Sequence, residues 1–180
     1  ATPAMRRVRF GMRERFVLTP MELGQSLTRY PAFAIVAFLL AGIGPRGVVF
    51  ADAWSGAWPL FVLGLGAVLS GSFLVPAFLP FVPFRAFSAK GWLVGAAVNA
   101  ALLHGAGLAA GMGPWLLGAC WAFFPAASAY MALNFTGCTT FTSPSGVQKE
   151  IRIALPFFIV AAALAVAGLV LWKLGHWSVP

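Results

Sequence analysis

Five long apolar segments, separated by short polar or glycine-rich stretches, make up most of the chain. Each is close to the ~20 residues that an α-helix needs to cross about 30 Å of hydrocarbon. They lie at about 31–50, 57–76, 91–111, 114–135 and 153–174. The first is interrupted by glycine, proline and arginine at 42–46, so we expect it to leave the membrane there. None of the segments alternates apolar and polar residues as a barrel strand does, so the pattern predicts a helical bundle.

The composition supports a bilayer as the solvent of these segments. The mean hydropathy is +0.89, and 61% of the residues are hydrophobic while 9% are charged. Soluble globular chains carry about 25% charged residues. In hydrocarbon the backbone must satisfy its own hydrogen bonds, which a helix does within one segment. We therefore predict an all-α fold, an integral membrane bundle of five transmembrane helices over 31–175, in a multi-pass protein of the cell's inner (cytoplasmic) membrane.

Basic residues are concentrated before the first apolar segment. The net charge is +8, and six of the twelve Lys and Arg residues lie within 1–30, which we interpret as a basic cytoplasmic or interfacial entry segment. Anionic lipid headgroups attract such clusters. The charge accompanies no nucleic-acid recognition motif, so the expected partner is the lipid bilayer and not nucleic acid.

The charges of the loops indicate the orientation. The loop with Arg85 and Lys90 and the polar loop 136–152 fall on the same side of the membrane as the N-terminus. The loop 51–56 and the turn 111–113 fall on the other side, and they carry no basic residue. The positive-inside rule then predicts a cytoplasmic N-terminus, with the polar loop 136–152 also in the cytoplasm.

Prolines indicate where helices start, kink or stop. Thr19 before Pro20 is typical of a helix start, either of a short helix in the headgroup region or of an extension of the first membrane helix. The three prolines between 76 and 83 cannot continue a regular helix, so the second helix should kink or stop there. Pro125 removes one donor in the fourth segment, where we expect a kink.

Small residues recur at multiples of four in the third segment. They are Gly91, Gly95, Asn99, Gly107 and Gly111. Such a stripe lets another helix approach closely, which we favour over a substrate path. His104 could relay protons or bind a ligand, although one hydrogen bond between helices is the commoner role. No acidic residue lies within the five segments, which argues against a proton or cation pump.

The polar tract 134–150 is the strongest candidate for function. It holds six Ser or Thr, two Gly and one Pro in seventeen residues. Gly137 suits a helix C-cap, and the next helix can start after Ser143, with Pro144 at its first position, or after Ser145. The tract is either a capped loop or a surface that faces a partner or a cofactor. The candidates for such contacts are Asn134, Thr136, Gly137, Thr139, Thr140, Thr142, Ser143 and Gly146.

The chemistry-bearing side chains form no recognisable catalytic or metal-binding set. Cys120 lies in an apolar run and Cys138 in the polar tract, without the spacing of a metal site or a disulfide framework. We expect Cys138 to fill a turn. The sequence therefore predicts no catalytic residue and no metal ligand in this chain.

Three runs of residues carry a resemblance to a known family. They are 16–23, 85–92 and 132–156, and the most specific part lies between Asn134 and Glu150. These runs resemble the C-terminal membrane domain of the mercury-methylating corrinoid proteins. The run 16–23 is similar to the entry into that domain, and 85–92 is similar to its second cytoplasmic loop.

The resemblance implies a cytoplasmic cobalamin-binding domain ahead of the five membrane helices, with a cysteine that ligates cobalt. It also implies a ferredoxin-like iron–sulfur partner that reduces the cobalt, and methyl transfer to Hg(II). Neither the corrinoid domain nor its cysteine lies in these 180 residues. The chain would then be the membrane domain of a corrinoid methyltransferase, which anchors and orients the cobalamin domain.

Two other classes stay open. A non-enzymatic membrane anchor could dock a soluble redox or iron–sulfur protein, together with other membrane subunits, in a larger membrane complex. A small transporter or channel is the third reading, and the sequence shows no inverted repeat to support it.

Overall fold

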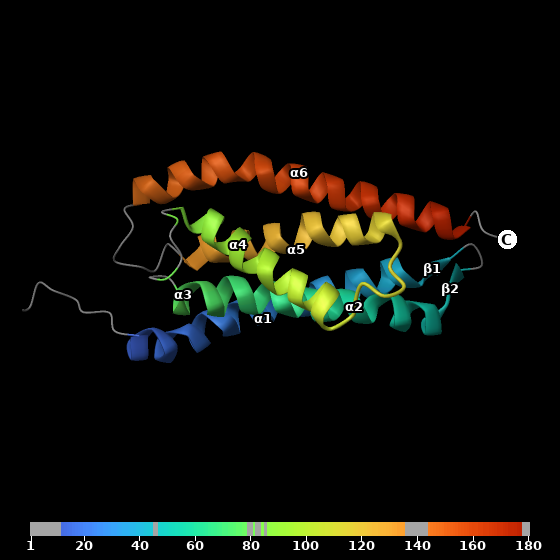
Figure 1. Cartoon of the computed structure of the whole chain (residues 1–180), viewed down its shortest axis with the longest axis horizontal. Helices are drawn as coiled ribbons and strands as arrows, with labels where there is room; N and C mark the ends of the chain where they lie inside the picture. Colours follow the sequence, from blue (N-terminus) through green and yellow to red (C-terminus); the bar gives the residue numbers. More distant parts are fainter. Residues whose placement is uncertain are drawn as a thin grey trace, which may run out of the picture.

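The computed structural model describes residues 12–44, 47–78, 81, 84, 86–135 and 144–177. Apart from one pair of two-residue strands, these residues form helices and turns (Figure 1). The helices are α1 (Met12–Gly42), α2 (Phe50–Leu69), α3 (Val75–Ala77), α4 (Phe87–Ala100), α5 (Pro114–Phe135) and α6 (Pro144–Trp177). A π-helical turn (Ser70–Leu74) joins α2 to α3, and a second (Ala101–Gly105) extends α4. The strands β1 (Ile43–Gly44) and β2 (Gly47–Val48) pair antiparallel between α1 and α2.

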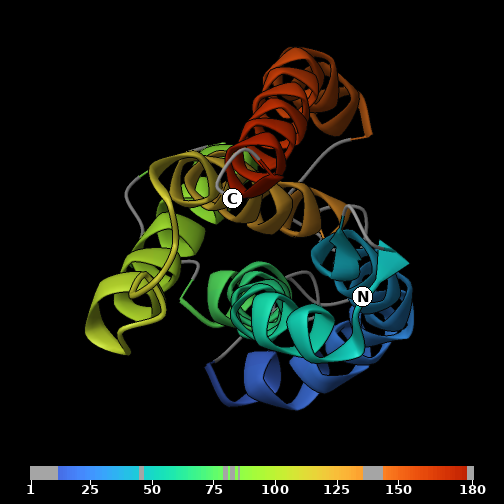
Figure 2. The same cartoon turned by 90° about the vertical axis from the view of Figure 1, so that its right-hand side faces the viewer.

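The helices run along the long axis of the molecule, and α5 is central among them. Viewed along that axis, α5 lies between α6 and the pair formed by α1 and α2, with α4 on a further side (Figure 2). The closest pairings are α4 with α5, α5 with α6, and α1 with α2. Figure 1 shows that α1 and α6 begin, and α5 ends, at one end of the bundle. We call this the polar end, because the two described ends of the tract 134–150 lie there, in α5 and α6.

Three of the helices are long and apolar enough to cross a membrane. They are Phe50–Ala77, Pro114–Asn134 and Gln148–Gly175, and α1 contributes a shorter apolar helix at Ser26–Gly42. In α6 only 17% of the most apolar stretch is buried inside the bundle. The outward side chains, such as Phe157 at 70% exposed, are those that lipid accommodates. These features indicate a multi-pass membrane protein.

The buried core lies where α1, α2, α5 and the π-helical turn after α4 meet. Leu63, Leu103 and Phe124 are almost completely buried in it, together with the free cysteine Cys120. Cys120 therefore behaves as a small apolar side chain in this core.

A lysine from α6 fastens α1 at the end of the bundle opposite the polar end. Lys173 Nζ donates to the carbonyl oxygens of Ala41 at 2.7 Å and Ile43 at 2.9 Å. The last carbonyls of a helix have no partner within the helix, and a cation suits the negative end of the helix dipole. Lys173 thus caps α1 from a helix about 130 residues later in the chain.

The first two helices differ from the sequence prediction at their starts. The helix does not start at Thr19, because α1 begins at Met12 and runs through Pro20. Of the two alternatives, the extension of the first membrane helix is the one that forms, since α1 continues to Gly42. A proline inside a helix lacks the N–H donor and its ring crowds the preceding turn, so Pro20 weakens α1 locally without ending it. The helix ends at Gly42, at the interruption expected there. Residues 51–56, expected as a loop, lie within the first turns of α2.

The third helix ends earlier than predicted. Its π-helical turn stops at Gly105, and the chain then forms a turn before α5. Gly107 has φ 73° and Gly111 has φ 85°, both in the left-handed region that glycine adopts without strain. These two glycines therefore shape a turn, and the stripe of small residues does not continue through them.

Prolines have the predicted effect in one helix. The α-helix that follows the first π-helical turn stops at Ala77, one residue after Pro76, as the run of prolines indicated. Helix α5 continues through Pro125 without interruption, and the kink expected there stays a prediction.

Candidate docking surface at the polar end of the bundle

The structure describes only the two ends of the polar tract. Asn134 lies exposed in the last turn of α5, and Gly146 lies in the first turn of α6. Helix α6 begins at Pro144, so the helix start that follows Ser143 is the one that forms, and residues 144–152 of the expected loop are helical. Cys138 lies outside the described residues. So do the other six candidates, Thr136, Gly137, Thr139, Thr140, Thr142 and Ser143.

A carboxylate of α6 caps the start of α4. Glu150 Oε1 accepts hydrogen bonds from the backbone N of Ser88 at 2.7 Å and from Ser88 Oγ at 2.8 Å. Ser88 is in the first turn of α4, whose N-cap residue Ala86 provides no side-chain cap. A negative charge there satisfies an unpaired N–H and suits the positive end of the helix dipole. This contact ties the beginning of α6 to the beginning of α4.

A small apolar cluster supports this contact. Phe87 of α4, Leu133 of α5 and Ala154 of α6 are buried together, with Phe158 packed against them. The ring of Tyr130 meets Phe158 edge to face, with centroids 5.9 Å apart. Three helices are therefore held in a fixed relation at the point where the polar tract leaves α5 and enters α6.

Replacing Glu150 with glutamine should lower the free energy of unfolding by about 1 kcal/mol. The neutral amide keeps the size and one acceptor but loses the charge that strengthens both hydrogen bonds. The measurement is unfolding of the purified protein in mild detergent by added SDS, followed by circular dichroism. Lys149→Gln is the matched control, because its side chain is exposed on the neighbouring position. Equal stability of the Glu150 and Lys149 variants would contradict the capping role.

A groove of about 710 Å³ lies beside this contact, between α4 and α6. Its walls include the aromatic side chains of Phe84, Trp92 and Phe157, and Lys149 and Glu150 lie among the lining residues. An apolar wall next to charged groups suits a protein segment with one apolar and one polar side. The groove therefore extends the candidate docking surface from the tract along α4 and α6.

Buried serines join three helices in the interior. Ser128 donates to the carbonyl oxygen of Gly91 at 2.9 Å, and its Oγ lies 2.8 Å from Ser70 Oγ. Ser70 Oγ also lies 3.0 Å from the carbonyl oxygen of Ala67. Hydrogen bonds between small polar side chains often join helices in membranes. Ser128 therefore has an interhelical role.

The small-residue stripe of α4 packs as predicted over its first part. A Cβ added at Gly91 would lie 2.6 Å from Ala129 Cα, and one added at Gly95 would lie 2.5 Å from Ser128 Cβ. Asn99 is 3% exposed, and its amide has no hydrogen-bond partner among the described residues. His104 is exposed and stacks on Trp121, with ring centroids 6.2 Å apart.

A metal site is not formed among the described residues. No group of three or more His, Cys, Asp or Glu side chains comes together in that part of the chain. The groove between α4 and α6 has no cysteine or histidine among its described lining residues. Cys120, the cysteine that the structure describes, is buried in the core.

The candidate surface thus consists of the ends of α5 and α6, the capped start of α4 and the groove beside them. The chain as a whole is a helical protein with candidate transmembrane helices. Compared with known proteins, the chain matches no family model, no curated protein and no solved structure.

Proposed function

We propose that this chain is the membrane domain of a corrinoid-dependent methyltransferase that resembles the mercury-methylating type. Its role is to anchor and orient a cytoplasmic cobalamin-binding domain. One observation supports the proposal: the described residues of the three runs that carry the resemblance, 16–23, 85–92 and 132–156, all lie toward the polar end. Helices α1, α4 and α6 begin there and α5 ends there (Figure 1). A domain that precedes α1 would join the bundle at that same end.

Five crossings of the membrane belong to this proposal. Three helices meet the length and hydropathy of a membrane span, and α1 and α4 would complete the set. Helix α4 and its π-helical turn run from residue 87 to 105, which at ~1.5 Å per residue is about 28 Å. This length is close to the ~30 Å of a hydrocarbon core.

The orientation of the bundle follows from the distribution of charge. Lys90, Lys149 and Arg152 lie near the polar end. At the opposite end, Lys173 is the single Lys or Arg in the described part of the chain. The positive-inside rule then assigns the polar end to the cytoplasm.

The contribution of this chain is positional. Methyl transfer to Hg(II), and the electrons from a ferredoxin-like iron–sulfur protein, would involve the preceding domain. The Glu150 cap and the Phe87 cluster fix the helix ends from which the polar tract extends. A rigid support of this kind suits a domain whose reacting face must be held in one orientation.

The double variant Thr139→Ala/Thr140→Ala tests the proposal in the native full-length protein. If the tract contacts the cobalamin domain, Hg(II) methylation by membranes should fall about tenfold, since misplacement of a reacting group is costly. Ser55→Ala is the control, because Ser55 is exposed at the opposite end and its hydroxyl donates to the nearby carbonyl of Asp52.

Wild-type methylation in the double variant, at normal expression, would count against a docking tract. Purification of the native protein also separates the two main classes. A corrinoid absorption spectrum in the purified protein is the expected result. Co-purification with other membrane subunits and no such spectrum would instead support a non-enzymatic anchor.

A further inference from the structure

A second cavity, of about 310 Å³, lies between α1 and α6 and is lined also by α2 and α5. Its walls are aromatic: Phe33 and Phe123 are nearly parallel, with centroids 6.0 Å apart, and Phe124 meets Phe33 edge-on. Gly64 leaves space for this arrangement, because a Cβ there would lie 2.5 Å from Phe33 Cε1. Tyr30 donates to the carbonyl oxygen of Phe61 at 2.6 Å and fixes α1 against α2. The aromatic side chains that line the cavity are therefore held in place by their packing within the bundle.

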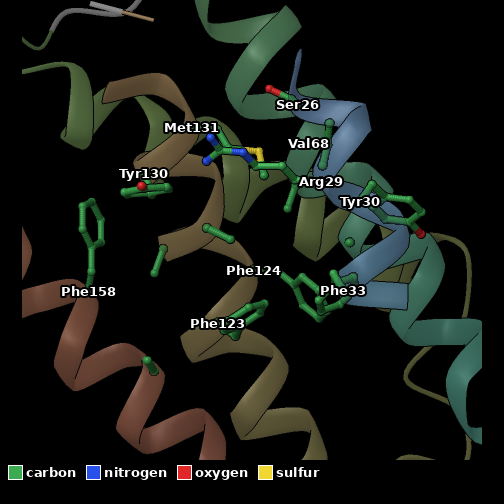
Figure 3. A pocket seen from close by; sticks show the side chains of 15 residues that line it. Ser26, Arg29, Tyr30, Phe33, Val68, Phe123, Phe124, Tyr130, Met131 and Phe158 are labelled. Atoms are coloured by element: carbon green, nitrogen blue, oxygen red, sulfur yellow. The ribbon is translucent and has the colours of Figure 1, made fainter. Parts of the chain in front are cut away.

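One end of the cavity carries a positive charge. Arg29 belongs to its lining and is exposed. Figure 3 shows its guanidinium reaching from α1 toward Met131 of α5, away from the ring of Phe123. None of the described lining residues is acidic. An apolar space with a cation at one end matches a molecule with an apolar chain and an anionic head.

We propose that this cavity binds one acyl chain of an anionic phospholipid, with the phosphate group at Arg29. The aromatic walls provide the apolar contact that an acyl chain requires. A guanidinium binds phosphate oxygens through two parallel hydrogen bonds. The volume is too small for a helix of a partner protein, which measures about 10–12 Å across with its side chains. The candidate membrane-spanning helices place the chain among phospholipids, and the inference does not depend on the methyltransferase proposal.

The test uses native mass spectrometry of the full chain released from bilayers. The bilayers contain equal amounts of phosphatidylglycerol and phosphatidylcholine with identical acyl chains. The wild-type protein should retain phosphatidylglycerol about fivefold more than phosphatidylcholine, as one arginine near an anionic headgroup would provide. Arg29→Gln should remove this preference. Arg152→Gln is the matched control, since Arg152 is an exposed arginine that lines neither cavity.

A second pair of variants tests the acyl-chain part of the site. Ala162 lines the cavity, and its neighbour Ala163 is exposed and does not. Ala162→Phe should reduce the retention of both lipids, whereas Ala163→Phe should leave retention unchanged. Equal retention of the two lipids by the wild-type protein would overturn the proposal. So would an Arg29→Gln or Ala162→Phe variant that retains lipid as the wild type does.

Discussion

Replacing Gly91 with alanine is expected to lower the free energy of unfolding by about 2–3 kcal/mol. The added Cβ would lie 2.6 Å from Ala129 Cα and 2.7 Å from Ala132 Cβ. One of these atoms belongs to the backbone of α5, so a change of side-chain rotamer cannot relieve the contact. Helix α4 would have to move away from α5 and weaken the closest helix pairing in the bundle.

The measurement is unfolding by SDS in mild detergent, with Gly118→Ala as the control. Gly118 is in the adjoining helix α5, and an added Cβ would meet nothing within 4 Å. That variant should be neutral or slightly more stable, because alanine favours a helix over glycine. Gly91→Ala/Gly95→Ala should cost less than the sum of the single variants, since one displacement of α4 relieves both contacts. A Gly91 variant as stable as the Gly118 variant would contradict the packing.

Replacing Lys173 with glutamate is expected to cost at least about 2 kcal/mol. The change removes two charge-assisted hydrogen bonds and places a carboxylate against the carbonyl oxygens of Ala41 and Ile43. It also puts a negative charge at the negative end of the α1 dipole. The same SDS titration measures the effect.

Two further variants separate the causes of this loss. Lys173→Met keeps the apolar stem and loses only the donor, so it should be less destabilising than the glutamate variant. Lys149→Glu reverses an exposed charge in the same helix and should have little effect. Wild-type stability of Lys173→Glu would show that α6 does not hold α1 in this way.

The apolar segments predicted the helical architecture because their signal is long and continuous. Each of the five segments corresponds to a helix, and Gly91 and Gly95 pack against α5 as their spacing predicted. The start of α6 at Pro144 was one of two expected starts. These features depend on residues close together in the sequence, which is where pattern and helix propensity are informative.

Features that depend on distant partners could not be predicted. Lys173 caps a helix about 130 residues away, and Glu150 caps one that begins about 60 residues earlier, so neither has a local signal. In the sequence, Gly107 continues the spacing of four and so looks like part of the helix. In the structure it has a positive φ and lies in the turn after α4. Six of the eight candidate residues of the polar tract lie outside the described part of the chain, so their role stays a prediction.

The π-helical turn Ser70–Leu74 has a consequence for ancestry. Such a turn holds one more residue than an α-helical turn, which is what insertion of a single codon into an older helix would produce. Val75 and Ala77 after the turn are as buried as Leu63 before it. Homologues one residue shorter across this stretch are therefore expected to present the same inward-facing positions on both sides of it. An alignment without a gap there would compare positions that differ by about 100° around the helix axis.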